Sequence, residues 1–295
     1  MRFLTLGAAA GGGLPQWNCG CANCAAARAG TIPQASQSSV AVTLNGQDWA
    51  ILNASPDLRV QLAASPALHP RGLRDSPVRS VLVTNGDVDH ITGLISLRES
   101  QPFDLFATGA IQAELTGSPV FNVMSPVVSR HAITTGQPFD LLPGLTATLF
   151  PVPGKVPLYQ ETGTVITDQI TDQTVGVELR GKGRRALYIP GCARVTDDLR
   201  ARIDGADLLF FDGTLWRDDE MLTTGTGTKT GARMGHLSID GPDGSIAALS
   251  GLTIGRRIFI HLNNTNPALD PRSPERAAAR AAGWDIAFDG QDITL

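Results

Sequence analysis

Short apolar runs, separated by turn residues, recur along the whole chain. Runs of this length that are rich in β-branched and aromatic residues are typical of strands that are buried on one or both faces. We expect strands over Phe3–Leu6, Val40–Leu44, Trp49–Asn53, Ser80–Thr84, Thr146–Val152, Thr174–Leu179, Ala186–Ile189, Leu208–Phe211, Arg257–Leu262 and Ile286–Phe288. The pattern therefore predicts many short strands, joined by turns.

Patterns of helical period are fewer and fall between the strands. We expect helices over Pro56–Ala64, Gly93–Glu99, Val195–Ile203 and Ser273–Gly283. The last of these begins with Ser-Pro-Glu and ends at a glycine, the favoured start and stop signals. Strands mixed with helices, without a long βαβ alternation, predict an α/β fold of two sheets covered by helices. No linker interrupts the pattern, so we expect residues 1–295 to form one domain.

Composition narrows the class of protein. The 295 residues are 42% hydrophobic and 18% charged, with a formal net charge of −4, which excludes disorder and gives no basic field for nucleic acid. No apolar run approaches the ~20 residues of a membrane span. The N-terminus becomes Gly-rich too early for the apolar segment of a signal peptide. We expect a cytoplasmic protein without disulfides.

Three of the four cysteines lie in one short loop, at about 17–25. Cys19, Cys21 and Cys24 have a spacing that lets thiolates surround one soft cation. A structural zinc needs four ligands, so the fourth would come from elsewhere. The alternative is a set of unmetallated thiols or a redox pair. Cys192, alone after a strand, is interpreted as a small buried apolar residue.

A second cluster of polar residues follows the strand Ser80–Thr84. Asp89 and His90 are sequence neighbours there, and at the start of a helix their side chains can converge on one ion. The alternative is that Asp89 caps the helix and His90 is an ordinary hydrogen-bonded residue.

Three further residues favour a site. Asp212 and His261 each end another apolar strand, and His236 follows a Gly-rich loop. Asp212 could orient a ligating imidazole, or it could simply begin a turn before Gly213. His236 could act as an acid or base, or hold substrate, because an imidazole titrates near neutrality.

These spacings resemble the metallo-β-lactamase superfamily, whose signature is a strand followed by His-x-His-x-Asp-His. Asn85 and Asp87 occupy the two leading histidine positions here, and Asp89 and His90 match the closing pair. The segments around Asp212, His236 and His261 resemble later ligand segments of the superfamily. The resemblance implies a four-layer αββα sandwich of two mixed sheets.

The likeness extends to a more specific family. The block from Gly11 to Cys24, the turn Asn53–Arg59, the segment Asp212–Trp216 and the segment His261–Pro267 are similar to coenzyme PQQ synthesis protein B. That resemblance implies a role in making pyrroloquinoline quinone (PQQ). Two roles are open: a carrier that moves PQQ or its precursor toward the periplasm, or an iron-dependent hydroxylase acting on the tyrosine ring of a Glu-Tyr precursor.

The altered signature bears on the metal. Asn85 offers only a neutral amide, a weak ligand, so we expect one active-site metal rather than two. The surviving set of Asp89, His90 and His261 has the ligand types of non-haem Fe(II) sites, which leave positions open for O₂ and substrate. The same three groups would bind Zn²⁺. The oxygenase hypothesis, an oxidoreductase with O₂ as co-substrate, therefore depends on the family resemblance.

Other polar residues are candidates to hold the substrate. Asn85 and Asp87 could bind its amino or carboxyl groups, and Arg59, Arg74 and Arg194 could clamp its carboxylates.

Asn264 lies three residues after His261, where some relatives place the fourth zinc ligand, and is our candidate for that position. Candidate partners are a small-molecule or dipeptide PQQ precursor, other PQQ-biosynthesis proteins and a second copy of the chain. A metallo-hydrolase such as a phosphodiesterase is a third hypothesis, which the loss of both leading histidines disfavours.

Overall fold

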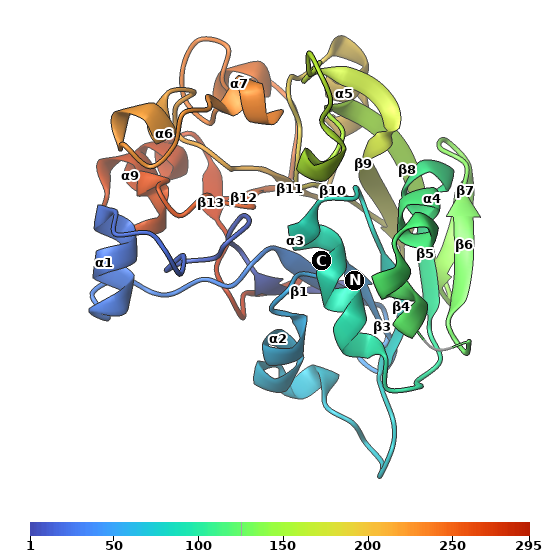
Figure 1. The fold of residues 1–295 in the computed structure, drawn as a ribbon. Helices are drawn as coiled ribbons and strands as arrows, with labels where there is room; N and C mark the ends of the chain where they lie inside the picture. Colours follow the sequence, from blue (N-terminus) through green and yellow to red (C-terminus); the bar gives the residue numbers. More distant parts are fainter. Residues whose placement is uncertain (125) are drawn as a thin grey trace.

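Within residues 1–124 and 126–295, which the computed structural model describes, two seven-stranded sheets pack face to face (Figure 1). The first sheet has the order β14 (Asp292–Thr294), β1 (Arg2–Gly7), β2 (Ser39–Thr43), β3 (Trp49–Leu52), β4 (Val78–Leu82), β5 (Asp104–Thr108) and β6 (Ser129–Ile133). The second has the order β13 (Trp284–Ile286), β12 (Arg256–Ile260), β11 (Leu208–Asp212), β10 (Arg184–Ile189), β9 (Gln169–Gly181), β8 (Leu145–Gly154) and β7 (Pro138–Leu142).

Both sheets are mixed in the same way. Neighbours from β14 to β3 and from β7 to β10 are antiparallel, whereas neighbours from β3 to β6 and from β10 to β13 are parallel. Parallel strands need crossover connections. The polar loops that begin these connections lie together at the carboxyl edge of the sheet.

Short helices cover the outer faces of the two sheets. They are α1 (Ala22–Arg28), α2 (Leu58–Ala64), α3 (Val88–Ile91), α4 (Gly109–Gly117), α5 (Asp197–Ile203), α6 (Glu220–Thr223), α7 (Gly231–Met234), α8 (Ser245–Ala248) and α9 (Pro274–Ala281). Short 3₁₀ helices span Pro66–Leu68, Thr92–Leu97, Pro119–Val123, Leu158–Gln160 and Pro267–Leu269. In the described part of the chain, no helix is both long and apolar enough to cross a bilayer.

Three apolar layers hold the elements together. The central layer lies between the sheets and includes Leu52 and Phe210. One outer layer packs Leu58 of α2 and Ile111 of α4 on the first sheet, and the other packs Leu199 of α5 on the second. This is the four-layer αββα sandwich of two mixed sheets that we expected.

Most expected strands are present within a few residues of their expected bounds. The strand expected over Ile286–Phe288 is instead β13, Trp284–Ile286, because Trp284 already pairs with Arg257 directly after the turn at Gly283. The helix expected over Gly93–Glu99 is the 3₁₀ helix Thr92–Leu97. The cysteine segment is not all loop, since α1 begins at Ala22.

Candidate functional site

The carboxyl ends of the parallel strands bring the expected site residues together. Asp89 and His90 lie in α3, which follows β4, while Asp212 is the last residue of β11 and His261 follows β12. His236 lies in the segment after α7. Two pairs of imidazole rings are in contact, with ring centroids 5.1 Å apart for His90 and His261 and 5.3 Å apart for His236 and His261.

Asp89, His90 and His261 form a group that could hold a metal ion. Their ligand atoms lie within 4.8 Å of one another. The Oδ2 atom of Asp89 is 2.9 Å from Nε2 of His261 and 3.9 Å from Nε2 of His90. The Nε2 atom of His90 is buried and has no hydrogen-bond partner among the described residues. A buried polar atom without a partner is costly, and an ion at this point would satisfy it.

The second nitrogen of each ligating ring is held in place by a neighbour. Nδ1 of His90 donates to the side-chain oxygen of Asn85 at 2.6 Å, and Nδ1 of His261 donates to Oγ1 of Thr214 at 2.8 Å. With Nδ1 protonated, each ring can present the lone pair of Nε2 toward Asp89. For His261, either a proton or a metal ion must then stand between Nε2 and the carboxylate.

The charges of the group suit a cation. Burial lowers the pKa of His90 to about 4, although the carboxylate of Asp89 partly offsets this shift, so the ring is neutral at physiological pH. Burial alone would raise the pKa of Asp89, but the neighbouring imidazoles, through charge and the hydrogen bond from His261, hold it well below its usual range. A carboxylate and two imidazoles are ligand types that fit a divalent transition-metal ion.

Asp212, His236 and His261 form a second group with close ligand atoms. The atoms of this group are already paired: Nδ1 of His236 is 2.7 Å from Oδ2 of Asp212, and Oγ1 of Thr214 donates to Oδ1 of Asp212 at 2.7 Å. Burial lowers the pKa of His236, but the charge and hydrogen bond of Asp212 outweigh it and raise the pKa overall. We therefore interpret Asp212 as the partner of His236. Thr214, which links this pair to His261, was not singled out from the sequence, where it looked like part of a turn.

Asn85 and Asp87 stand at the two leading histidine positions of the superfamily signature. Their surroundings differ. The side-chain oxygen of Asn85 is engaged by His90 and by the backbone N–H of Asp87 at 3.1 Å. The Asp87 carboxylate accepts no hydrogen bond from the described residues. Burial and the charge of Asp89 raise the pKa of Asp87, and the ammonium of Lys155 partly offsets both. Asn85 thus orients the ring of His90, whereas the Asp87 carboxylate has no hydrogen-bond donor among the described residues.

The arginines proposed from the sequence do not reach this cluster. Arg59 on α2 and Arg74 in the loop before β4 are exposed, and among the described residues neither forms a hydrogen bond or ion pair with the site. Arg194 is half-exposed and pairs with Asp168 at 3.3 Å. Lys155 instead acts on this cluster, because its charge partly offsets the raised pKa of Asp87. The sequence pattern did not mark this lysine.

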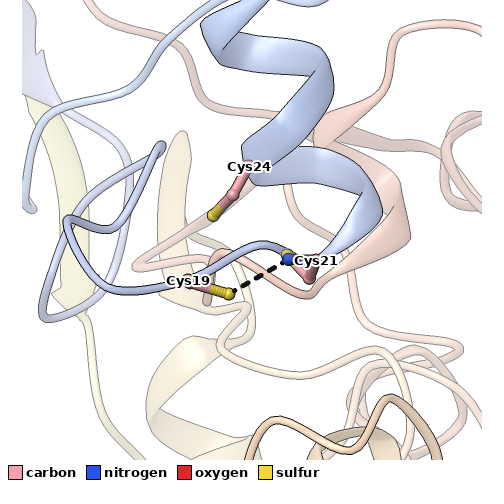
Figure 2. Close-up of side chains that lie close together, drawn as sticks. All are labelled: Cys19, Cys21 and Cys24. Carbon is pink, nitrogen blue, oxygen red and sulfur yellow. Dashed lines mark hydrogen bonds between the residues drawn. The ribbon is translucent and has the colours of Figure 1, made fainter.

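The three clustered cysteines form a separate candidate site. Figure 2 shows the sulfur of Cys24, in the first turn of α1, directed toward the segment that carries Cys19 and Cys21. The backbone N–H of Cys21 donates to the Cys19 sulfur at 3.4 Å. Burial raises the pKa of the Cys21 thiol to about 11, so a divalent cation would be needed to keep all three thiols ionised.

Asn264 completes this cluster from the loop after β12. Its side-chain amide nitrogen, Nδ2, donates to the sulfurs of Cys19, Cys21 and Cys24 at 3.2 Å, 3.5 Å and 3.3 Å. A tetrahedral zinc with typical bond lengths would place its oxygen and sulfur ligands about 3.6 Å apart, so the fourth position fits the amide if its oxygen faces the ion. The sulfur of Cys192 is buried and contacts the carbonyl of Arg194, as expected of a residue outside the metal sites.

Comparison with known proteins agrees with this architecture. Residues 48–262 match the family model described as a β-lactamase superfamily domain. The fold and site are thus those of a metal-binding protein of that superfamily.

Curated relatives define the family more closely. Coenzyme PQQ synthesis protein B of Ruegeria pomeroyi is 55% identical, and that of Methylobacterium radiotolerans is 54% identical, each over the full length of both chains. The chain belongs to the coenzyme PQQ synthesis protein B family.

Solved structures agree with this family and with the fold. The crystal structure of zinc-bound PqqB from Methylobacterium extorquens is 53% identical, covers all of both chains and superposes with a TM-score of 0.99. A diphosphatase of the PhnP family, at 20% identity and a TM-score of 0.70, covers 99% of this chain and shares the fold alone. The zinc-bound relative and the two ligand clusters support metal binding by this chain.

Proposed function

We propose that this chain acts in PQQ biosynthesis as an Fe(II)- and O₂-dependent hydroxylase of the tyrosine ring of a Glu-Tyr-derived precursor. Family membership supports the pathway, because full-length relatives carry the name of PQQ synthesis proteins. The observation that carries the reaction class is the group of Asp89, His90 and His261, with the unpartnered Nε2 of His90 facing the carboxylate.

The ligand set distinguishes this proposal from hydrolysis. Two-metal hydrolases use further imidazoles to hold a second cation, and here Asn85 and Asp87 stand at those positions. One carboxylate with two imidazoles leaves coordination positions open, as in non-haem iron oxygenases. When bound at this group, Fe(II) would supply the activation of O₂.

The remaining residues of the site have roles in holding ligands and moving protons. Asn85 and Thr214 keep the Nε2 atoms of the two ligating imidazoles free. We assign to the Asp212–His236 pair the exchange of a proton with the phenol of the substrate, and the hydrogen bond between them, by which Asp212 stabilises a protonated His236, supports this role. Asp87, with no hydrogen bond to its carboxylate among the described residues, is the candidate partner of the substrate's amino group.

The decisive experiment is mass spectrometry of reaction products. Protein loaded anaerobically with Fe(II) and then exposed to ¹⁸O₂ with a Glu-Tyr dipeptide and a two-electron reductant, which takes the second oxygen atom to water, should give a product that carries the labelled oxygen. Zinc-loaded protein should give none. The variants His90→Ala and His261→Ala should lose product at least about 100-fold, since each removes a ligand.

His69→Ala is the matched control, because His69 is exposed in the loop after α2 and contacts only the backbone of Ala63 among the described residues. This variant should react like the unaltered protein. If iron-loaded protein yields no labelled product and instead binds PQQ tightly, the hydroxylase proposal fails and a carrier role replaces it. If activity survives both histidine substitutions, the ligand assignment is wrong.

A further inference from the structure

Three cationic side chains surround one carboxylate beside the metal cluster. Glu161 is 3.0 Å from the Lys155 ammonium, 2.9 Å from the Arg233 guanidinium and 4.0 Å from the Lys229 ammonium. The hydrogen bond from Arg233, and then that from Lys155, lower the pKa of Glu161 to about 2. The carboxylate is therefore ionised, and the cluster holds three positive charges against one negative charge.

These cations come from two segments of the chain that are in contact with each other beside the site. Lys155 and Glu161 lie in the segment after β8, and Arg233 lies in α7; Figure 1 shows the segment after β8 close to α7. The stem of Lys155 packs on Gly235, since a Cβ at that glycine would be 3.2 Å from Cγ of Lys155. Gly235 directly precedes His236, so the cluster adjoins the site.

The backbone of Lys155 is tied to the other side of the site as well. Its carbonyl accepts a hydrogen bond from the Thr174 hydroxyl at 3.2 Å, and Thr174, within β9, forms an isolated antiparallel bridge with Asn85, which follows β4. The Lys155 ammonium also interacts electrostatically with Asp87. Even if Asp87 is counted as ionised, one positive charge remains unmatched at the edge of the metal cluster.

We infer that Lys155, Lys229 and Arg233 form a subsite that binds a carboxylate of an acidic substrate next to the metal cluster. This inference rests on the proposed function for the identity of the substrate, a precursor with the carboxylates of a glutamyl-tyrosine unit. The surplus charge attracts a carboxylate. Both Nη atoms of Arg233 already donate to Glu161, at 3.3 Å and 2.9 Å, so its remaining N–H groups and the Lys229 ammonium, 4.0 Å from Glu161, are the donors left for a substrate. Glu161 holds the three cations at one point, which pre-organises the subsite.

The test measures binding separately from turnover. Isothermal titration of zinc-loaded protein would compare Glu-Tyr with Gln-Tyr amide, which lacks both carboxylates. Each of the variants Lys155→Gln and Arg233→Gln should weaken Glu-Tyr binding about tenfold, the size expected for one charge-assisted contact. Binding of Gln-Tyr amide should change less than about twofold. Equal weakening of both ligands, or no change for Glu-Tyr, would overturn the inference.

Arg79→Gln provides the matched control. Arg79 also pairs with a carboxylate, Asp48, at 2.9 Å, but near the amino end of β4, away from the site; its loss should leave both affinities unchanged. If circular dichroism shows that Lys155→Gln or Arg233→Gln is unfolded, Lys229→Gln takes its place, because Lys229 is farther from Glu161 than the other two cations and more exposed than Lys155.

The outcomes separate this inference from the proposed function. Charge-dependent binding of Glu-Tyr without labelled product in the oxygen experiment would overturn the hydroxylase proposal alone. Hydroxylation of Glu-Tyr with a KM that Arg233→Gln leaves unchanged would overturn the subsite alone. If the unaltered protein does not bind Glu-Tyr at all, the subsite inference is overturned too, whatever the result of the oxygen experiment.

Discussion

At the scale of single residues, the site depends on side chains that orient the ligands. Thr214 has one hydroxyl proton, which it gives to Asp212, so its oxygen accepts the Nδ1–H of His261. This arrangement fixes the tautomer that leaves Nε2 of His261 free for an ion. A residue that never touches the metal thus determines whether its neighbour can bind it.

Thr214→Val should weaken metal binding at the Asp89, His90 and His261 group by about 10- to 100-fold, as is usual when the partner of a ligating histidine is removed. Valine keeps the shape of threonine but offers no acceptor. Competition titration of iron or zinc against a chelator would measure the change. Thr214→Ser is the matched control and should retain affinity within a few-fold. Equal loss in both variants would show that packing, not the hydroxyl, is responsible.

At the scale of elements, the turn after β3 holds α3 in position. The backbone N–H of Ala54 donates to the carbonyl of His90 at 2.8 Å, and the N–H of Gly93 donates to the carbonyl of Ala54 at 2.9 Å. Asn53, with a φ of 62°, directs its side chain to the backbone N–H of Thr84 at 2.9 Å. The turn therefore fixes both ends of the segment that carries the ligands.

Gly93→Ala should destabilise the fold by about 1–3 kcal/mol, because a Cβ there would overlap the carbonyl oxygen of Ser55 and lie 2.8 Å from that of Ala54. Backbone atoms cannot rotate away as a side chain can. Since α3 must shift, active-site metal affinity should fall as well. Urea unfolding and metal titration would measure the two effects. Gly109→Ala is the control, since open space surrounds a Cβ at that position, and it should leave both unchanged. An unaltered unfolding midpoint in Gly93→Ala would contradict this account.

At the scale of the whole molecule, contacts between distant parts of the chain are dense. The central apolar layer joins residues of both sheets, such as Leu52 and Phe210. Asn264 meets cysteines that precede it by about 240 residues, and the N–H of Leu295 donates to the carbonyl of Met1 at 2.9 Å. These contacts support our proposal that residues 1–295 form one domain.

The protein should accordingly unfold in urea in one cooperative transition, because neither sheet can lose the other without exposing the central layer. Tryptophan fluorescence and far-ultraviolet circular dichroism would report it independently. Trp49 lies in the first sheet and Trp284 in the second, so subtracting the fluorescence of the Trp49→Phe or the Trp284→Phe variant from that of the unaltered protein would give the signal of each sheet. Coincident midpoints are expected. Two separate transitions would show that the sheets belong to different units.

The sequence by itself determined the local elements and the types of ligand. Hydrophobic runs marked most strands because apolar side chains must be buried, and polar residues just after those runs marked Asp89, Asp212 and His261. Cysteine spacing marked the second metal site. Strands β5 to β7 were not expected from the sequence: the edge strand β6 is half-exposed, and none of the three produced a clear apolar pattern.

Only the tertiary structure decided which of these residues meet. Sheet order sets which strand ends are neighbours, and nothing in a local pattern encodes it. That order joins His236 to Asp212, turns Thr214 from a turn residue into a partner of His261 and places Asn264 over the cysteines. It also leaves Arg59 and Arg74 on the surface and brings a lysine to the site instead, because long-range packing, not residue type, sets what a side chain can reach.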